Sequence, residues 1–212
     1  MKRVNKQGQA LGRKGEESRR RLLDATLALL AKGSIHKISA SAIAREASMA
    51  SQSFYLYFKE IEEVILALAQ EAAVDLQEVV ALLSNAPSGS EPEMLSTQVI
   101  DAFASYWDRH RSVLIARNYI ADSGDRQFLK LRQDAAMPMI HALADRIQAA
   151  RPGGVNRVEA VSRAIVVYSA MERMAARAKV EQFDPPPGDV VDLHQAEIDI
   201  LTLLFTPQKD RG

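Results

Sequence analysis

The sequence contains no cysteine, so it can form no disulfide, carries no thiolate nucleophile and offers no sulfur ligand to a metal. It also has no apolar run near the ~20 residues that a membrane-spanning helix needs. The best candidates are Val64–Ala69 and Ala164–Tyr168. The basic N-terminal segment lacks the apolar core and cleavage site of a secretory signal. We therefore expect a cytoplasmic protein with no membrane partner.

Signatures of catalysis are also scarce. The chain has 4 histidines, and it lacks both a glycine-rich phosphate-binding loop and the serine turn of hydrolases. His141 and Asp145 lie one turn apart on a predicted helix, a spacing that can bind a metal. Such a pair is more often an ordinary polar contact, and no third ligand accompanies it. The sequence therefore predicts no enzyme, no metal site and no cofactor.

The net charge of zero hides an uneven distribution along the 212 residues. Residues 1–60 hold 12 basic and 5 acidic side chains, for a net charge of +7, and the remainder carries −7. A basic first quarter joined to an acidic remainder indicates that one end of the chain meets a polyanion. Because residues 1–15 supply much of the excess as a possible basic tail, a DNA-binding prediction has to depend on the folded part from Glu16 onward.

Hydrophobic periodicity predicts helices throughout, and no segment shows the β-branched alternation of a hairpin. Glycine, proline and serine clusters separate the later helices. We predict an all-α protein with about nine helices: Glu16–Lys32, Ser39–Ala47, Ser51–Phe58, a long helix from Ile61 to Leu83, Glu93–Arg109, Ser112–Asp122, Asp125–Ala150, Asn156–Glu181 and Asp189–Phe205.

Two short helices joined by a tight turn, inside a basic three-helix unit, form the geometry that presents a helix to the major groove of DNA. Phe54 and Phe58 are the expected core anchors of the second short helix. Small, amide and phenolic side chains remain to reach base edges or phosphates, and basic side chains surround them. The predicted DNA contacts are Ser39, Arg45, Ser51, Gln52, Ser53, Tyr55, Tyr57 and Lys59, with Lys37 as additional basic charge. Gln52 and Tyr57 are favoured for direct contact, whereas capping and solvation compete for Ser51 and Ser53.

The segments Ala42-Ile-Ala-Arg-Glu-Ala-Ser-Met-Ala50, Ser53-Phe-Tyr-Leu-Tyr-Phe-Lys59 and Glu62-Glu63-Val64 resemble the N-terminal domain of the TetR family of bacterial transcriptional repressors. The resemblance covers about Leu22 to Leu68. It implies a repressor that binds a palindromic DNA operator as a homodimer and is released by a small-molecule inducer. The implied domains are a flexible basic arm (1–15), a helix-turn-helix DNA-binding domain (16–60) and a ligand-binding and dimerisation domain (61–212).

Three residues depart from the pattern of that family. Ser48 replaces the glycine of the turn, and Ala50 replaces the serine that caps the recognition helix. Ile61 replaces a lysine whose ammonium can touch phosphate, a charge that Lys59 could supply instead. A lost cap costs about 1 kcal/mol. These departures bear on the individual DNA contacts and leave the fold prediction unchanged.

The resemblance also implies an inducer pocket among the middle helices and a dimer seam on the last two. Aromatic, methionine and hydrogen-bonding side chains favour an apolar or aromatic small molecule, although each is more often plain core. The pocket candidates are Phe103, Trp107, Asn118, Tyr119, Met137, His141, Tyr168 and Met171. The last helix is apolar on two sides, which suits a four-helix seam or a helix buried within one chain. The seam candidates are Val161, Ile165, Leu193, Ile200, Leu201 and Leu204.

Two other classes of function remain open at this point. A helical adaptor without DNA would leave the basic helix-turn-helix unexplained, and a helical enzyme is the weaker alternative. DNA binding with a steep salt dependence would separate a regulator from both.

Overall fold

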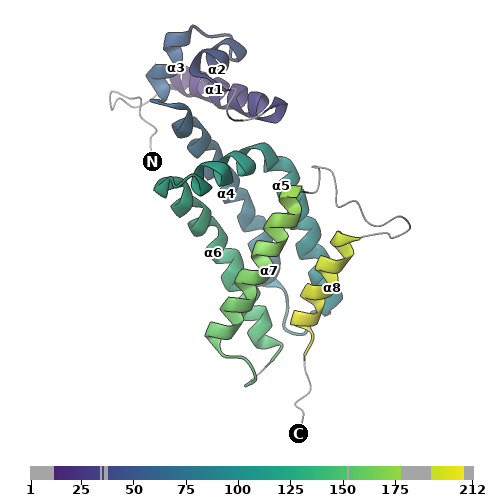
Figure 1. Ribbon diagram of the computed structural model, residues 1–212. Coiled ribbons are helices and arrows are strands. Elements are labelled where there is room, and N and C mark those ends of the chain that lie inside the picture. Colours follow the sequence, from purple (N-terminus) through teal and green to yellow (C-terminus); the bar gives the residue numbers. More distant parts are fainter. Residues whose placement is uncertain (1–11, 34, 36–37, 152, 178–191, 208–212) are drawn as a thin grey trace, which may run out of the picture. The chain divides into compact units, whose positions relative to one another are not determined.

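The computed structural model describes residues 12–33, 35, 38–151, 153–177 and 192–207 (Figure 1). Within these ranges it contains eight α-helices and no strand, which confirms the all-α prediction. The helices are α1 (Arg13–Lys32), α2 (Ala40–Glu46), α3 (Ser51–Tyr57), α4 (Ile61–Asn85), α5 (Pro92–Asp122), α6 (Arg126–Ala149), α7 (Arg157–Arg177) and α8 (Leu193–Phe205). None of the helices in the described ranges is long and apolar enough to cross a membrane.

The predicted break between Arg109 and Ser112 is wrong, because α5 continues through it as one helix of 31 residues. Neither glycine nor proline lies in this stretch, so no residue there opposes the helix. Helix α1 begins at Arg13, so the last three residues of the expected flexible arm (1–15) are helical. Residues 1–11 and Lys37 lie outside the described residues, as do the predicted helical ends at 178–181 and 189–191.

Contacts divide the chain into two packing units. The first packing unit comprises Met1–Ala72 and Ser112–Arg132, and the second comprises Ala73–Arg111 and Gln133–Gly212. The division falls within α4, α5 and α6, so each of these helices contributes residues to both units. The predicted functional boundary at residue 60 is a different division and stays a prediction.

The first packing unit has a continuous apolar core. Helix α1 contributes Leu22, Leu23 and Leu30, and the short helices contribute Ile43 and Phe54. Residues from the end of α5 and the start of α6 complete the same core: Val113, Ala116, Ile120, Ala121 and Phe128. The helix-turn-helix region is thus held from two segments of the chain that lie far apart in sequence.

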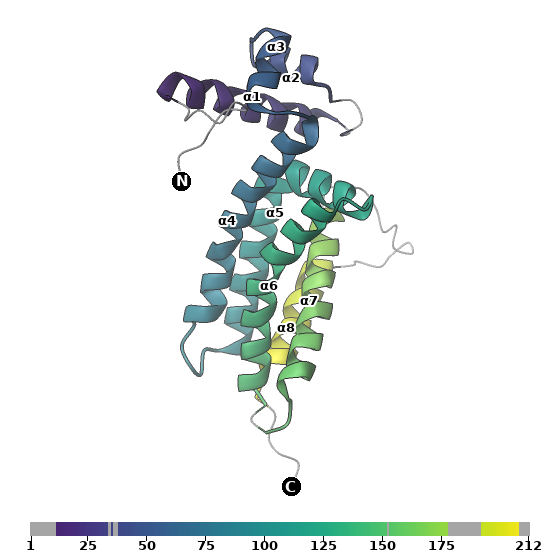
Figure 2. The same ribbon diagram turned by 90° about the vertical axis from the view of Figure 1, so that its left-hand side faces the viewer.

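The second packing unit is helical, with α5, α6 and α7 lying alongside one another in both views and α8 in contact with α7 (Figure 2). Tyr106 and Trp107 are its largest fully buried side chains. The ring of Tyr106 lies 6.1 Å from that of Phe103, which in turn meets the Tyr168 ring edge-on at 5.8 Å. These rings join α5 to α7 through contacts of the kind that aromatic pairs prefer.

Arginine side chains bind carbonyls at the C-terminal ends of four helices. These carbonyls have no partner within their own helix, and a guanidinium offers five N–H donors. Arg111 donates to Ala175 O at the end of α7 (2.7 Å), and Arg146 donates to Leu83 O at the end of α4 (2.7 Å). Arg151 reaches the end of α8, and Arg21 reaches the end of α2. These contacts fix the ends of helices at positions distant in sequence.

Candidate functional site

Helix α3 has one buried and one open face. Phe54 is 0% exposed and Phe58, directly after the helix, is also buried, which confirms both as core anchors. On the opposite face Tyr55 is 51% and Leu56 is 56% exposed, and Ser51 and Gln52 are exposed beside them. A short helix anchored on one side and open on the other is the arrangement that can enter a DNA groove.

Aromatic and cationic contacts hold α3 in place. The Phe54 and Phe58 rings lie 5.8 Å apart, and the Arg19 guanidinium of α1 lies 5.0 Å from the centre of the Phe58 ring. A cation over an aromatic face is attracted to the ring and adds to the packing. Nothing in the sequence predicts this contact, because Arg19 is one of three consecutive arginines.

The turn between α2 and α3 is a helix-capping motif centred on Ser48. The Ser48 N–H donates to Arg45 O (3.0 Å) and the Met49 N–H to Ala44 O (2.8 Å), which is the Schellman pattern. Ser48 has φ 54, the left-handed conformation that favours glycine. Arg21 of α1 donates to the carbonyls of Ala47 and Ser48, so a second helix holds the strained turn. The hydrogen bonds from Arg21 therefore help to hold a serine in a conformation that favours glycine.

Replacing Ser48 with glycine is expected to raise the free energy of unfolding by about 0.5–1 kcal/mol, because glycine adopts the left-handed conformation without strain. Urea titration followed by circular dichroism measures the change. Ser88→Gly is the matched control: Ser88 is exposed in a loop at negative φ, so glycine there should stabilise nothing. Equal effects of the two substitutions would contradict the strain assigned to Ser48.

The other predicted DNA contacts lie around α3 in the first packing unit. Ser39 accepts the Ala42 N–H (3.2 Å) as the N-cap of α2, so its hydroxyl has a structural role. Arg45 and Lys59 are exposed, whereas Ser53 and Tyr57 are half-buried. The Ala50 side chain makes no capping bond, and α3 begins at Ser51 without one. Arg45, just before α3 in the chain, and Lys59, just after it, therefore add exposed positive charge on either side of this helix in sequence.

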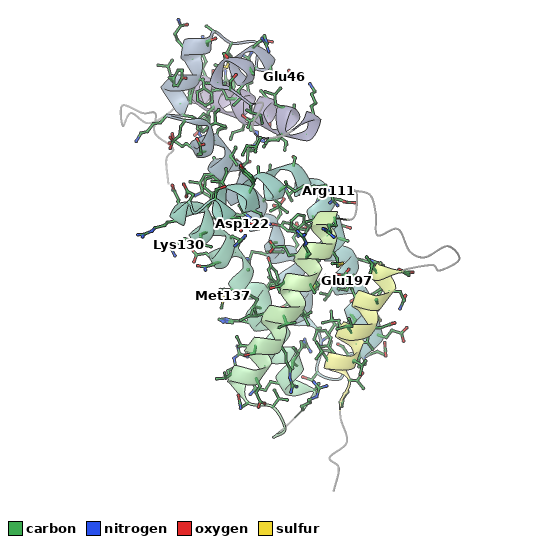
Figure 3. All side chains as sticks on the ribbon, in the orientation of Figure 1. Glu46, Arg111, Asp122, Lys130, Met137 and Glu197 are labelled. Carbon is green, nitrogen blue, oxygen red and sulfur yellow. The ribbon has the colours of Figure 1, made fainter. Side chains whose placement is uncertain are left out.

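The predicted pocket residues do not form one group. Asn118 and Tyr119 belong to the first packing unit, and the other six belong to the second. Phe103, Trp107, Tyr168 and Met171 are buried among the core side chains, whereas His141 is exposed and Met137, labelled on α6 in Figure 3, is 38% exposed. Among the predicted pocket residues, the fold places the rings of Phe103 and Tyr168 in contact, 5.8 Å apart.

Two neighbouring hollows of about 360 Å³ each lie between α4 and α5 in the second packing unit. Both are lined by Glu78 and Leu82, and the side chains of the predicted pocket line neither. Arg109 and Glu78 form an ion pair (3.2 Å) at the edge of one hollow. Within the described part of the chain, no group of three or more histidine, aspartate or glutamate side chains could hold a metal ion.

Helices α7 and α8 leave apolar side chains uncovered. Ile165 on α7 is 45% and Ile200 on α8 is 55% exposed, and Leu193 is also exposed. Leu201 is 0% exposed and packs inside the chain with Ile198 and Phe205, so its side chain is not available to a second chain. Three further apolar residues of these helices, which were not among the seam candidates, are also exposed: Val158, Val166 and Leu203. Leu203 lies three residues after the seam candidate Ile200, and residues at this spacing share one side of a helix, so the sequence could have identified it.

Glu197 of α8, labelled in Figure 3, is a carboxyl with a buried oxygen. Its Oε1 has no hydrogen-bond partner among the described residues. Burial raises the pKa of Glu197 from 4.5 to about 7, and the charge of His194 opposes the shift. His194 itself lies 2.9 Å from Asp101 on α5.

The raised pKa of Glu197 predicts a pH-dependent contribution to stability. The folded chain holds this proton up to about pH 7, whereas the unfolded chain releases it near pH 4.5. The contribution is therefore present below pH 4.5 and is lost as the pH rises toward 7. Glu197→Gln should match the parent stability at pH 4.5 and exceed it at pH 8, as measured by urea unfolding. The exposed Glu93→Gln serves as control, and a parallel response of both variants would contradict the assignment.

Family comparisons agree with this architecture over most of the chain. Residues 22–68 match the family model described as bacterial regulatory proteins, tetR family. Residues 78–205 match the model described as the tetracyclin repressor-like C-terminal domain. No protein of the curated set matches the sequence. The two matched models together span the helix-turn-helix and the later helices.

Solved structures share the fold at low sequence identity. A TetR-like transcriptional regulator from Rhodococcus sp. RHA1 is 21% identical, with coverage of 92% of this chain and 96% of that one and a TM-score of 0.62. The repressor FadR of Thermus thermophilus, in complex with lauroyl-CoA, is 21% identical over 92% and 96% of the chains, with a TM-score of 0.55. The regulator FadR of Bacillus subtilis, in complex with stearoyl-CoA, is 16% identical over 90% and 99%, with a TM-score of 0.62. With an N-terminal and a C-terminal family model both matched in order along one all-α fold, this chain belongs to the TetR family of bacterial regulatory proteins.

Proposed function

We propose that the protein is a transcriptional repressor that binds a palindromic operator as a dimer and leaves it when a small molecule binds. The observation that carries the proposal is the open face of α3, a helix anchored by Phe54 and Phe58 with its other side exposed. In a helix-turn-helix protein this second helix lies in the major groove.

The residues around α3 divide by their chemistry. The amide of Gln52 and the hydroxyl of Tyr57 are suited to base edges, and Ser51, Ser53 and Tyr55 can reach bases or phosphates. Arg45 and Lys59 are exposed cations that would neutralise phosphates. Ser39 could contribute a phosphate contact only alongside its capping bond to Ala42.

A dimer would double the number of bases read and impose the palindrome. The proposed seam consists of α7 and α8, which are in contact with each other and expose Ile165, Leu193 and Ile200. Val161 and Leu204 are half-buried on the same helices and would complete it. Two helices from each chain would then form a four-helix seam.

The proposed inducer is an apolar or aromatic small molecule held in the second packing unit. The buried rings of Phe103, Trp107 and Tyr168 supply apolar surface, and Met171 supplies an adaptable side chain. The acyl-CoA complexes of the two FadR proteins show that relatives of this fold accept ligands with long apolar chains. Binding would shift α4, which starts four residues after the last residue of α3, and change the spacing of the two α3 helices in a dimer.

The test begins with selection of DNA sequences from a random pool by the full-length protein. Fluorescence anisotropy then measures affinity for the selected duplex at several salt concentrations, and a log–log slope equivalent to several phosphate contacts is expected. Gln52→Ala and Tyr57→Phe should each weaken binding by about 5–150-fold, because each removes a base contact of about 1–3 kcal/mol.

Gln77→Ala is the control, since Gln77 is an exposed glutamine of α4 in the second packing unit. Unchanged affinity in both Gln52→Ala and Tyr57→Phe would remove the contact assignments. A pool that yields no enriched sequence, with no salt-dependent binding, would favour the helical adaptor.

A further inference from the structure

We propose that α3 reads A·T base pairs, with Gln52 bound to an adenine and Leu56 packed on the methyl group of a nearby thymine. This inference rests on the proposed DNA-binding function and names the class of DNA sequence that the protein selects. It depends on three properties of α3: its lack of charge, the exposure of Leu56 and the spacing of the two residues.

The seven residues of α3, SQSFYLY, include no charged side chain. The commonest contact to guanine is a bidentate bond from arginine or lysine, and cytosine is typically read by a carboxylate. Helix α3 offers neither group. Its one amide, Gln52, has the donor and acceptor pair that matches N6 and N7 of adenine. The chemistry of the helix therefore favours A·T over G·C pairs.

Leu56 is an apolar residue without a role in the core of the first packing unit. Its side chain is 56% exposed, whereas the core residues two positions before and after it, Phe54 and Phe58, are 0% and 2% exposed. Burial of its isobutyl group against an apolar partner is favourable, and the thymine methyl is the apolar group that the major groove displays. A polar residue at this position would gain nothing from that methyl group.

Gln52 and Leu56 lie four residues apart, so both side chains project from one side of α3. The rise along a helix of four residues is about 6 Å, and stacked bases are about 3.4 Å apart. The two side chains therefore reach adjacent or next-but-one base pairs. Gln52 makes no hydrogen bond to another described residue, so its amide is available to a base.

The exposed cations Arg45 and Lys59 flank α3 and carry the groups that could read guanine instead. Arg45 lies in the last turn of α2 and Lys59 lies beyond the end of α3. In a helix-turn-helix the first helix crosses the DNA backbone, which places Arg45 near phosphates. The base readers are then the side chains of α3 itself.

The experiment uses the full-length protein and the duplex that it selects from a random pool. Each thymine of the half-site is replaced in turn by deoxyuridine, which removes the methyl group and keeps the base pairing. We expect one thymine at which replacement weakens binding about fourfold, or about fifteenfold when both half-sites are changed, the loss that one buried methyl group predicts. Leu56→Ala should bind the thymine and deoxyuridine duplexes equally, and Leu56→Met should restore the difference.

Gln52→Ala is the matched variant on the same side of the helix. It should keep the response to deoxyuridine and lose the preference for adenine at its own position. The inference is overturned if no deoxyuridine replacement weakens the parent protein, if Leu56→Ala keeps the full response, or if the half-site is G·C at the positions that Gln52→Ala affects. Each of these results leaves salt-dependent operator binding intact, whereas failure of the proposed function would abolish the selection itself.

Discussion

Glutamate at both Ile165 and Ile200 is expected to convert a dimer of this protein into monomers. Ile165 is 45% and Ile200 is 55% exposed, on two helices that contact each other, and a second chain is the proposed cover for both. A dimer would have to bury four unpaired carboxylates in its apolar seam, which costs several kcal/mol. The dissociation constant should rise at least about 1,000-fold, the equivalent of about 4 kcal/mol.

Sedimentation velocity at micromolar concentration measures this change directly. Val74→Glu is the control, because Val74 is 67% exposed on α4 and has no place in the proposed seam. The monomeric variant should keep its helical content and its weak affinity for a single half-site while losing tight binding to the palindrome. A double variant that stays dimeric, or a Val74→Glu variant that dissociates to the same extent, would place the interface elsewhere.

Phe54→Ala is expected to unfold the helix-turn-helix region and abolish DNA binding. Phe54 is fully buried, its ring lies 5.8 Å from Phe58 and 5.4 Å from Tyr55, and α3 has no capping bond at Ala50 to hold its start. Truncation of a buried phenylalanine costs about 3–5 kcal/mol. A seven-residue helix cannot persist without tertiary packing, so the loss of this anchor removes the open face as well.

Differential scanning calorimetry and DNA binding check this prediction together. Phe54→Leu keeps most of the buried volume and should lose only about 1 kcal/mol. Because the exposed isoleucines of α7 and α8 belong to the second packing unit, Phe54→Ala should leave the oligomeric state unchanged. Wild-type DNA affinity in Phe54→Ala would show that α3 does not depend on this anchor.

Much of the fold could be predicted because it follows from local patterns. The boundaries of α2 and α3 follow from the Ser39 cap and the aromatic spacing of Phe54 and Phe58, both of which the structure contains. The continuity of α5 was missed because a short polar stretch at His110 looks like an interruption although nothing there prevents a helix. The arginine contacts were also missed, since Arg146 binds Leu83 across 63 positions of the sequence.

The candidate site was predictable in outline and less so in its individual residues. The open face of α3 follows from small and polar residues opposite two phenylalanines, yet the exposed Leu56 was overlooked because apolar residues are expected in the core. The sequence cannot separate a pocket role of Phe103 and Trp107 from an ordinary core role, because a buried ring has the same sequence signature in either case. Leu201 was placed in the seam for the same reason, since both sides of α8 are apolar.

The packing of Val113, Ile120 and Phe128 against α1 and α3 affects how regulators of this fold can be recombined. A chimera that joins the first 60 residues of this chain to the remainder of a relative would pack α1, α2 and α3 against the relative's side chains at these positions. The graft would have to carry Ser112–Arg132 as a second insert, or the two parental cores would need to match at those positions. A transplant of the helix-turn-helix therefore requires two separate segments of this chain, because both contribute to its core.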